Sequence, residues 1–358
     1  MRLGLDTYSL RWQGWNAFQM LDYCVQLGLE NVHFSERGFL ASLDEGYLRS
    51  LRCRADELGL SLEIGMLSFD RYSGLFTPEY GTAEQQLRDM IRAAKTLGSP
   101  IVRCVLGNQA DRLGPIPYEK HVEEGLRVLR AVSSLARDLE ITLAVENHGG
   151  VDFLARELKA FVEEAGTDYV GVCLDTGNPA AAGEDPVLAT EVLAPYVVSS
   201  HLRDSRVWAV PEGAMVQWVP VGQGCVDLRR ILEMLSESAP AAPINLEIIT
   251  GVPSHPKLIP YLNPDSDFWK IYPGMLARDL TRFIQLAECG KPEPLEQVTL
   301  PPGARVPPAG ELGEQLRVQQ RRHLEESVSY ARTVLEARVE SRGQARGNQW
   351  HHDSSLRP

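Results

Sequence analysis

Long apolar runs and paired cysteines are both absent from this sequence of 358 residues. No apolar stretch reaches the ~18 residues that a membrane-spanning helix needs, and the first residues lack the apolar core and cleavage site of a signal peptide. The six cysteines occur singly, without the Cys-x-x-Cys spacing of zinc or redox sites. We therefore expect a cytoplasmic protein with no membrane span and no disulfide framework.

Positive charge is also scarce. The chain has 36 Lys and Arg against 48 Asp and Glu, which gives a net charge of −12. Residues 301–358 carry nine Arg and seven acidic residues, so the first 300 residues carry −14. Because a negative field of this size repels phosphate backbones, we expect no nucleic-acid partner. The hydrophobic content of 44% is ordinary for a soluble globular protein.

Strand-like and helix-like segments alternate along most of the chain. Eight strands are expected, at residues 2–8, 30–34, 61–66, 101–106, 141–145, 169–174, 196–202 and 244–249. A helical segment follows each strand, at residues 16–27, 47–58, 82–97, 118–139, 151–165, 186–193, 228–236 and 274–286. Glycine follows the first two helices, as is typical of helix ends, and suggests a repeated strand-helix plan.

This alternation predicts an α/β fold, a (β/α)8 TIM barrel over residues 1–290. Parallel strands need crossover connections, and eight such units close naturally into a barrel. A doubly wound open sheet is the alternative, but no strand is followed by the Gly-x-Gly-x-x-Gly turn of a dinucleotide-binding fold.

Two insertions interrupt the alternation after the seventh and eighth strands. The first, residues 208–225, contains a predicted hairpin that ends in Val219-Pro220-Val221-Gly222-Gln223-Gly224. The second, residues 250–272, is rich in proline and aromatic residues. In a barrel both lie at the C-terminal face, where loops form active sites, so we expect them to act as lids or binding walls. The alternative is that they are variable surface loops.

The composition changes beyond the barrel. Residues 291–340 are expected to form a Pro-rich connector and a C-terminal helix, and residues 341–358 a polar, disordered tail. The helix, at residues 311–340, carries one apolar stripe: Leu312, Leu316, Leu324, Val328, Leu335 and Val339. Such a stripe must cover either the barrel flank or another subunit, so both a barrel contact and a homo-oligomer or partner subunit remain open.

Four consecutive predicted strands end on groups that can bind a metal. The fifth ends at Glu146, the sixth at Asp175, the seventh carries His201 and the eighth Glu247. All four ends meet at one mouth of a barrel. Three carboxylates and an imidazole suit Mn²⁺, Mg²⁺ or Co²⁺ better than a structural zinc, and without a cation such carboxylates repel one another and take up protons. Taken alone, Asp175 is more often a helix cap or loop residue and His201 more often an interior histidine, so the prediction depends on the joint pattern of the four strands.

Five motifs resemble the xylose-isomerase-like barrel superfamily, which includes sugar isomerases, sugar epimerases and inosose dehydratases. They are Glu146-Asn147-His148-Gly149-Gly150, Leu174-Asp175-Thr176-Gly177-Asn178, His201-Leu202-Arg203-Asp204, Val221-Gly222-Gln223-Gly224 and Leu246-Glu247. The resemblance covers roughly residues 1–290. It implies that Glu146, Asp175, His201 and Glu247 bind a divalent ion and that the two glutamates work as acid and base. Many members have His where this chain has Asn178, and many epimerases place an Arg a few residues after the histidine, for which Arg206 is the candidate.

The expected function is a divalent-metal-dependent sugar isomerase or epimerase, with Mn²⁺ as the first choice of ion. Removing a proton beside a carbonyl gives an enediolate, which a divalent ion stabilises. Glu146 and Glu247 are the expected acid/base pair, and His148 either protonates an oxygen or leaving group or orients Glu146. Expected substrate contacts are Arg206, Asn178 and Trp269. The chain has no Gly-rich phosphate cradle, which favours an unphosphorylated substrate.

Three other functions remain open. The first is a metal-dependent lyase on a keto-sugar, either a dehydratase or an enzyme that cleaves a 3-keto-glycoside by β-elimination. The second is suggested by the zinc-dependent endonucleases of abasic DNA in the same superfamily, but they need a histidine cluster for several zinc ions. The predicted barrel has only His33, His121, His148, His201 and His255. The third is a non-catalytic binding scaffold.

Overall fold

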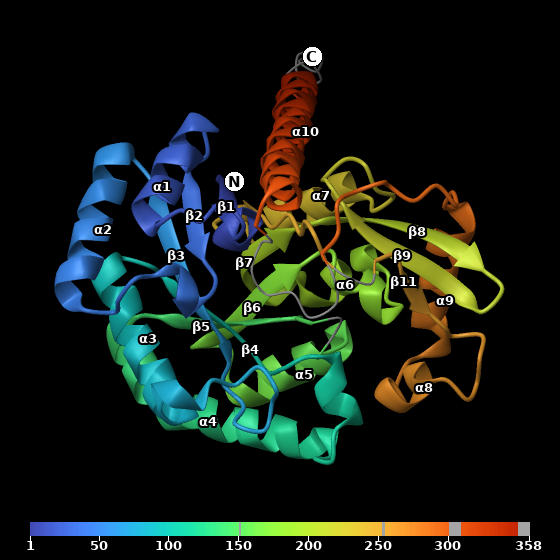
Figure 1. The fold of residues 1–358 in the computed structure, drawn as a ribbon, viewed down its shortest axis with the longest axis horizontal. Coiled ribbons are helices and arrows are strands. Elements are labelled where there is room, and N and C mark those ends of the chain that lie inside the picture. Colours follow the sequence, from blue (N-terminus) through green and yellow to red (C-terminus); the bar gives the residue numbers. More distant parts are fainter. Residues whose placement is uncertain (150–151, 253–254, 301–308, 350–358) are drawn as a thin grey trace, which may run out of the picture.

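The computed structural model describes residues 1–149, 152–252, 255–300 and 309–349, and its centre is a closed barrel of parallel strands. The strand order around the barrel is β1-β10-β7-β6-β5-β4-β3-β2. These strands are β1 (Leu3–Asp6), β2 (Asn31–Phe34), β3 (Ser61–Ser68), β4 (Ile101–Val105), β5 (Thr142–Glu146), β6 (Val170–Asp175), β7 (Val197–Leu202) and β10 (Ile244–Leu246). The predicted (β/α)8 barrel is confirmed (Figure 1).

Seven helices surround the strands in the expected order. They are α1 (Ala17–Gln26), α2 (Glu45–Leu58), α3 (Ala83–Leu97), α4 (Tyr118–Leu139), α5 (Ala155–Ala165), α6 (Pro186–Leu193) and α7 (Leu228–Ser238). Short 3-10 turns connect elements at η1 (Thr7–Leu10), η2 (Arg37–Phe39), η3 (Pro78–Tyr80), η4 (Gln109–Leu113), η5 (Ala180–Ala182) and η6 (Ala194–Tyr196). Within the described ranges, no helix combines the length and apolarity that crossing a membrane requires.

The start of α5 differs from the expectation. The predicted helix begins at residue 151, which lies outside the described residues, whereas α5 begins at Ala155. The physical reason is Asp152, whose carboxylate accepts hydrogen bonds from the backbone N–H groups of Gly107 (3.0 Å) and His148 (2.8 Å). These bonds tie the segment before the helix to the neighbouring strand ends.

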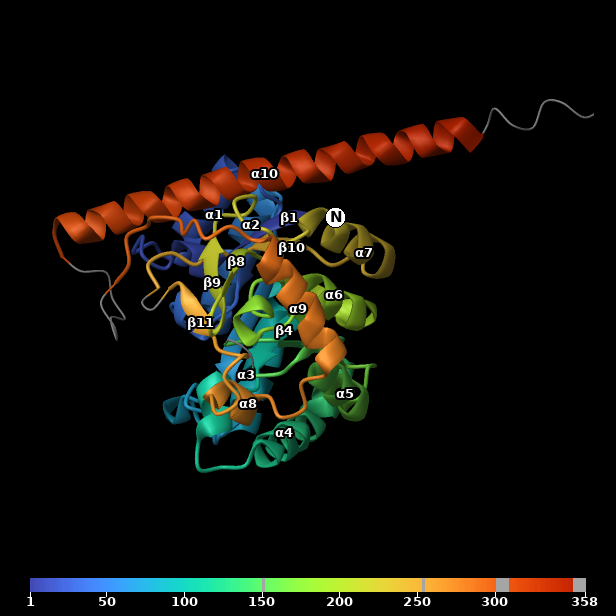
Figure 2. The same cartoon turned by 90° about the vertical axis from the view of Figure 1, so that its right-hand side faces the viewer.

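The eighth helical position is also filled differently from the prediction. The segment expected to close the barrel forms α9 (Ala277–Cys289), but its buried Leu280, Phe283 and Ala287 belong to a separate apolar cluster with the insertion strands. The C-terminal helix α10 (Glu311–Gln349) instead lies beside the barrel between α1 and α7 (Figures 1 and 2). Its Leu324 and Val328 are buried in the main core.

Polar contacts also attach α10 to the barrel. The Gln320 side chain accepts from the Trp12 backbone N–H (3.2 Å), and the Ser327 hydroxyl accepts from the Val221 N–H (2.9 Å). The described part of the predicted stripe therefore covers the barrel flank, although Leu312 is exposed and the side chain of Val339 lies outside the described ones. The expected tail differs as well, because α10 continues to Gln349; residues 350–358 lie outside the described part. Extending an existing helix is energetically easier than starting one.

The two insertions form one antiparallel sheet at the C-terminal face. It contains the predicted hairpin, β8 (Asp204–Val210) and β9 (Gly213–Val219), and a third strand, β11 (Lys257–Ile259), which pairs with β9. The hairpin starts four residues earlier than expected. The second insertion also forms the short helix α8 (Asp267–Ile271). Residues 253–254 lie outside the described part.

Candidate metal centre and active site

The four predicted metal ligands come together at the C-terminal mouth of the barrel. Glu146 and Asp175 are the last residues of β5 and β6, His201 lies near the end of β7, and Glu247 directly follows β10. One ligand atom from each residue lies within 4.8 Å of all the others. Glu146, Asp175 and His201 are fully buried, and Glu247 is 8% exposed. Parallel strands of one barrel deliver their end residues to a shared site.

Three atoms of this group lack a hydrogen-bond partner among the described residues. They are Glu146 Oε1, His201 Nδ1 and Glu247 Oε2. His201 Nδ1 lies 3.2 Å from Glu146 Oε2 and 3.5 Å from Glu247 Oε2. Buried polar atoms without partners are costly, and a divalent cation would satisfy all three at once. The donor set therefore fits a divalent ion.

The pKa directions agree with this interpretation. Burial raises the pKa of Glu247 well above its usual range, although His201 and Arg203 oppose the shift. Burial disfavours a charged His201, yet the carboxylates of Glu146, Asp6 and Glu247 help to hold its pKa well above the ordinary value. Without a cation, this cluster therefore takes up protons, and a metal ion would replace them.

Side chains from β1, β2 and β4 hold the ligands from behind. Asp6 Oδ2 lies 3.0 Å from His201 Nε2, on the side of the imidazole opposite the proposed ion. Arg103 Nε donates to Glu146 Oε2 (2.5 Å), and its Nη1 donates to the Met66 carbonyl (3.2 Å). Such contacts fix the orientation of a metal ligand and tune its basicity. His33, on β2, contacts His201, and Glu63, on β3, lies 3.9 Å from His33. We call Asp6, His33, Glu63 and Arg103 the bracing residues.

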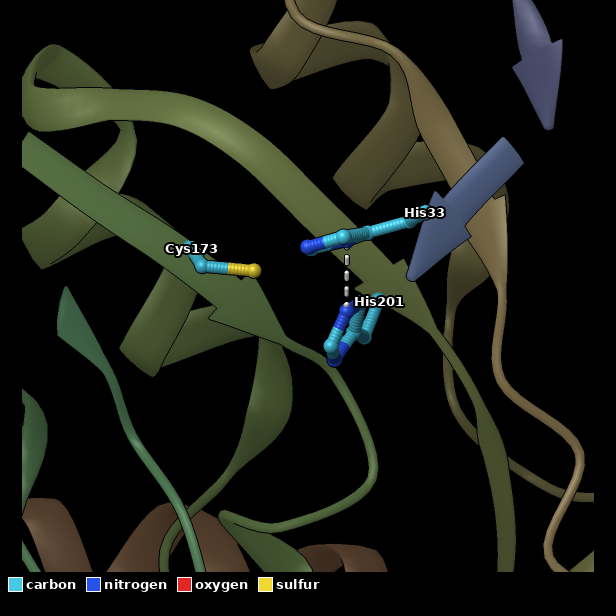
Figure 3. A group of neighbouring side chains, drawn as sticks. All are labelled: His33, Cys173 and His201. Atoms are coloured by element: carbon cyan, nitrogen blue, oxygen red, sulfur yellow. Dashed lines mark hydrogen bonds between the residues drawn. The ribbon is translucent and has the colours of Figure 1, made fainter. Parts of the chain in front are cut away.

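A second group of metal-competent side chains, His33, Cys173 and His201, adjoins the first (Figure 3). His33 Nδ1 lies 3.1 Å from His201 Nε2, and Cys173 points toward both rings from β6. A metal needs Cys173 as a thiolate, but burial raises the pKa of this thiol to about 11. His201 Nε2 also faces Asp6, whereas Nδ1 has no hydrogen-bond partner among the described residues, so the Nδ1 side is the one that fits a cation.

Asn178 belongs to the site and connects two of its strand ends. Its side-chain NH₂ donates to the Asn147 carbonyl (2.9 Å), and its Oδ1 accepts from Arg203 Nη1 (3.0 Å). Arg203 Nη1 also donates to Asp175 Oδ2 (3.1 Å). Both oxygens of Asp175 therefore have partners, since Oδ1 accepts from the Gly177 N–H (2.7 Å). A carboxylate oxygen has two lone pairs, so these bonds leave room for a cation.

His148 stands at the edge of the site in a fixed orientation. Its Nδ1 lies 3.0 Å from the Gly107 carbonyl, and its backbone N–H donates to Asp152. Burial lowers the pKa of His148, which favours a neutral ring. A neutral imidazole that donates Nδ1–H to a carbonyl leaves Nε2 to exchange a proton with a substrate.

The structure does not bring Arg206 or Trp269 to the four ligands. Arg206 lies on β8, and its guanidinium donates to the carbonyls of Gln223 (2.9 Å) and Glu293 (2.6 Å). Arg203 takes the position near the ligands instead. Successive side chains of extended backbone point to opposite faces. Arg203 and Arg206 are three residues apart, an odd number, so their side chains point to opposite faces. Trp269, on α8, packs edge-on against Phe268 in the cluster of the insertion sheet.

The bracing residues and Arg203 are site residues that the sequence analysis does not single out. Asp6 ends the first strand, so the strand-end rule that identifies Glu146 also applies to it. Arg203 lies inside the motif that contains His201. His33, Glu63 and Arg103 carry no comparable signal, because each lies within a strand where either face is a candidate for the interior.

Comparison with known proteins agrees with this architecture. Residues 21–263, more than half of the chain, match the family described as xylose isomerase-like TIM barrel. Among characterised sequences, the chain is 26% identical over 211 residues to 3-oxo-isoapionate decarboxylase of Pectobacterium atrosepticum, covering 57% of this chain and 69% of that protein.

Two solved structures share the fold. One is D-psicose 3-epimerase with D-tagatose from Clostridium cellulolyticum H10, with a TM-score of 0.57, 15% identity, and coverage of 80% of this chain and 96% of that chain. The other is the IOLI protein with a binding zinc atom, with a TM-score of 0.53, 17% identity, and coverage of 80% and 95%. At these identities the structures support the fold alone. With the family match over most of the barrel, the chain belongs to the xylose isomerase-like TIM-barrel family.

Proposed function

We propose that this protein is a divalent-metal-dependent sugar isomerase or epimerase that removes a proton next to a carbonyl group. The observation that carries the proposal is the buried cluster of Glu146, Asp175, His201 and Glu247, with three ligand atoms lacking partners among the described residues. Family membership makes an enzyme acting on a small carbohydrate the natural starting point.

Glu146 and Glu247 are the proposed acid and base. They come from β5 and β10, which are separated by β6 and β7 in the barrel, so their carboxylates approach the mouth from different sides. One carboxylate removes the proton and the other returns it. Return to the same carbon on the opposite face gives epimerisation, and return to the neighbouring carbon gives aldose–ketose isomerisation.

The remaining residues position these carboxylates and the sugar. A bound divalent ion would stabilise negative charge on the carbonyl oxygen. Three carboxylates and one imidazole favour Mn²⁺, with Mg²⁺ or Co²⁺ as alternatives, while the zinc of the IOLI structure makes Zn²⁺ a necessary test. Arg103 holds Glu146, Asp6 orients His201, and Asn178 links the ends of β5 and β6.

Deuterium incorporation tests the proposal. The metal-loaded protein is incubated in D₂O with a panel of ketoses, aldoses and keto-sugars, and the products are analysed by NMR. The expected result is solvent deuterium in an epimerised or isomerised sugar, lost in Glu247→Gln and retained in Glu45→Gln, which changes an exposed glutamate. Failure to bind any of Mn²⁺, Mg²⁺, Co²⁺ or Zn²⁺ stoichiometrically would contradict the proposal and favour a binding scaffold.

A metal-dependent lyase is the second candidate, and His148 favours it. A neutral ring whose Nδ1–H is held by the Gly107 carbonyl has an unprotonated Nε2, which can take a proton from the substrate and then return it to a leaving group or a developing carbanion. The similarity to 3-oxo-isoapionate decarboxylase points in the same direction. In the same experiment, release of CO₂, water or an aglycone, abolished by His148→Gln, would favour the lyase over the isomerase.

A further inference from the structure

Arg203 presents one edge of its guanidinium without a partner. The side chain is 5% exposed, and Nη1 donates to Asp175 and Asn178. Nε and Nη2 are buried and have no hydrogen-bond partner among the described residues. These two N–H groups point in the same direction, and this is the edge with which arginine binds a carboxylate or phosphate through two parallel hydrogen bonds.

The surroundings hold this guanidinium rigidly. Its Cζ lies 4.0 Å above the Trp218 ring, and Trp218 Nε1 donates to the Gly177 carbonyl (3.2 Å). Gly177 contributes no side chain next to Nε: an added Cβ would lie 3.0 Å from Nε and 2.8 Å from the Arg203 Cβ. A guanidinium edge that is already held in place loses little entropy when it binds an anion, so the geometry suits recognition of a ligand.

Two further basic side chains, His255 and Lys257, lie on the same side of the site as Arg203. The His255 ring stacks on Trp218 at 4.3 Å between centroids, and its Nδ1 is buried without a partner among the described residues. Lys257, on β11, donates from Nζ to the uncharged oxygens Gln109 Oε1 (2.8 Å) and Ala181 O (3.0 Å). Burial, with Arg203 and Lys257 nearby, lowers the pKa of His255 to about 4. Arg203 and His255 both contact the Trp218 ring, and Lys257 lies two residues beyond His255.

Arg103 provides an internal contrast. Its Nε is occupied by Glu146 and its Nη1 by backbone carbonyls, so it acts within the protein. Arg203 makes similar bonds through Nη1 alone and leaves the bidentate edge open. The two arginines lie near the same ligands, but only the Nε/Nη2 edge of Arg203 lacks protein partners among the described residues.

We propose that the substrate of this enzyme carries an oxyanion, a carboxylate or a phosphate, that binds the Nε/Nη2 edge of Arg203 with support from His255 and Lys257. This inference rests on the proposed function, because it defines the substrate class for the same site. A carboxylate agrees with the expectation of an unphosphorylated substrate, whereas a phosphate would revise it, with two parallel N–H groups in place of a Gly-rich loop as the anion site. The overall charge of −12 does not oppose it, because binding depends on the local field.

Binding of non-reacting probes tests the inference independently of catalysis. Isothermal titration of the full-length, Mn²⁺-loaded protein compares D-gluconate, D-glucitol 6-phosphate and neutral D-glucitol. One of the two anions is expected to bind at least ~10-fold more tightly than D-glucitol, equivalent to about 1.4 kcal/mol. Preference for gluconate would identify a sugar acid as the substrate class, and preference for the phosphate a sugar phosphate. Equal binding of all three probes would overturn the inference.

Two variants and a control localise the effect. Arg203→Gln is expected to reduce affinity for the preferred anion roughly 10- to 100-fold more than it reduces affinity for D-glucitol. Because loss of a buried charge can disturb folding, Gly177→Ala serves as a second variant: it keeps every charge but occupies the space next to Nε. Arg206→Gln is the matched control and is expected to bind like wild type. An equal loss for anionic and neutral probes in both variants would contradict the assignment.

The two proposals fail in different ways. If neutral keto-sugars exchange deuterium while the anionic probes bind no better than D-glucitol, only the oxyanion inference is overturned. If the anions bind through Arg203 but no substrate, neutral or anionic, reacts with any of the metals, the oxyanion site is supported and the proposed reaction is overturned.

Discussion

The two halves of the barrel mouth contribute different kinds of side chain. The half formed by β5, β6, β7 and β10 supplies the four proposed ligands, three of which have a buried atom without a partner among the described residues. The half formed by β1 to β4 supplies the bracing residues: Asp6, His33 and Arg103 contact the ligands, and Glu63 lies behind His33. Buried atoms without a partner among the described residues also occur on Asp6, His33 and Glu63, so the two halves differ in arrangement: ligand atoms of one half converge on a single point, and the other half lies behind them.

The bracing half extends down the barrel as a polar network. Glu63 Oε2 accepts from Asn31 Nδ2 (3.0 Å), Ser199 Oγ (3.0 Å) and Asn245 Nδ2 (2.8 Å). His33 Nδ1 lies 3.9 Å from the same oxygen and 3.1 Å from His201. A connected network of this kind is rigid, because each polar group constrains the next. The layer of side chains below the four proposed ligands therefore serves to position them.

Removing a carboxylate from the ligand half should have the largest effect. Glu146→Gln and Glu247→Gln each remove a proposed ligand and one partner of the acid/base pair, so we expect loss of at least ~10³-fold in kcat/KM. Stoichiometric metal content, measured by mass spectrometry of the dialysed protein, should fall as well. A variant that retains both activity and metal would show that its carboxylate belongs to the bracing half.

Truncation on α10 tests whether the barrel needs its C-terminal helix. Leu324 is fully buried in the main core, so Leu324→Ala should lower the free energy of unfolding by ~2–5 kcal/mol. Val318, which is 49% exposed on the same helix, provides the control variant Val318→Ala. Urea denaturation followed by circular dichroism measures both. Equal stability of the two variants would mean that α10 contributes little to the barrel in solution.

The variant Asp6→Asn tests whether Asp6 positions His201 or is itself a metal ligand. The amide keeps the shape of Asp6 but removes the charge that faces His201 Nε2 at 3.0 Å. Contacts of this kind typically contribute 10- to 100-fold to metal affinity, so we expect Mn²⁺ binding to weaken by about that factor while its stoichiometry stays at one. Competition with a chelator measures the affinity. Complete loss of the metal would assign Asp6 to the ligand half instead.

The ligand half was predictable from sequence because strand ends are visible there. Apolar runs that stop at Glu146 or Asp175 identify both the strand and the face to which it points, and Glu247 is the one carboxylate inside the apolar run of the eighth strand. The same rule applied to the first strand would have identified Asp6. The interior positions of His33 and Arg103 depend on which face of each strand points inward, and a four- or five-residue strand buried on both faces gives no alternation to read.

The arrangement of the last helices was not predictable for a related reason. The apolar faces of α9 and α10 are each suited to any apolar surface, and the chain order makes the nearer helix the obvious candidate to close the barrel. The insertion sheet and the barrel flank compete for these apolar faces. Which helix packs on which surface is decided by tertiary packing, which the sequence pattern does not reveal. The position of Arg206 away from the four ligands was not predictable either, because the direction of its side chain depends on the register of β8.

The smallest expected effect concerns Glu63 and appears as a pH dependence of stability. Burial raises the pKa of Glu63 to about 6, although its three donors oppose the shift. The native state therefore binds a proton more tightly than the unfolded state, whose glutamate pKa is about 4.3. Its contribution to stability is complete below pH ~4.3 and decreases as the pH rises through about 6, by roughly 2 kcal/mol in total.

Glu63→Gln lacks this titration but keeps an oxygen that can accept the same hydrogen bonds. The free energy of unfolding of the variant, relative to wild type, should therefore rise by roughly 2 kcal/mol between pH 4.5 and pH 7. Urea denaturation in the presence of EDTA at both pH values measures the difference, with the exposed Glu57→Gln as control. A difference that does not change with pH would mean that Glu63 is ionised throughout this range. The polar network would then hold a permanent charge below the metal site, and the bracing half would contribute electrostatically as well as sterically.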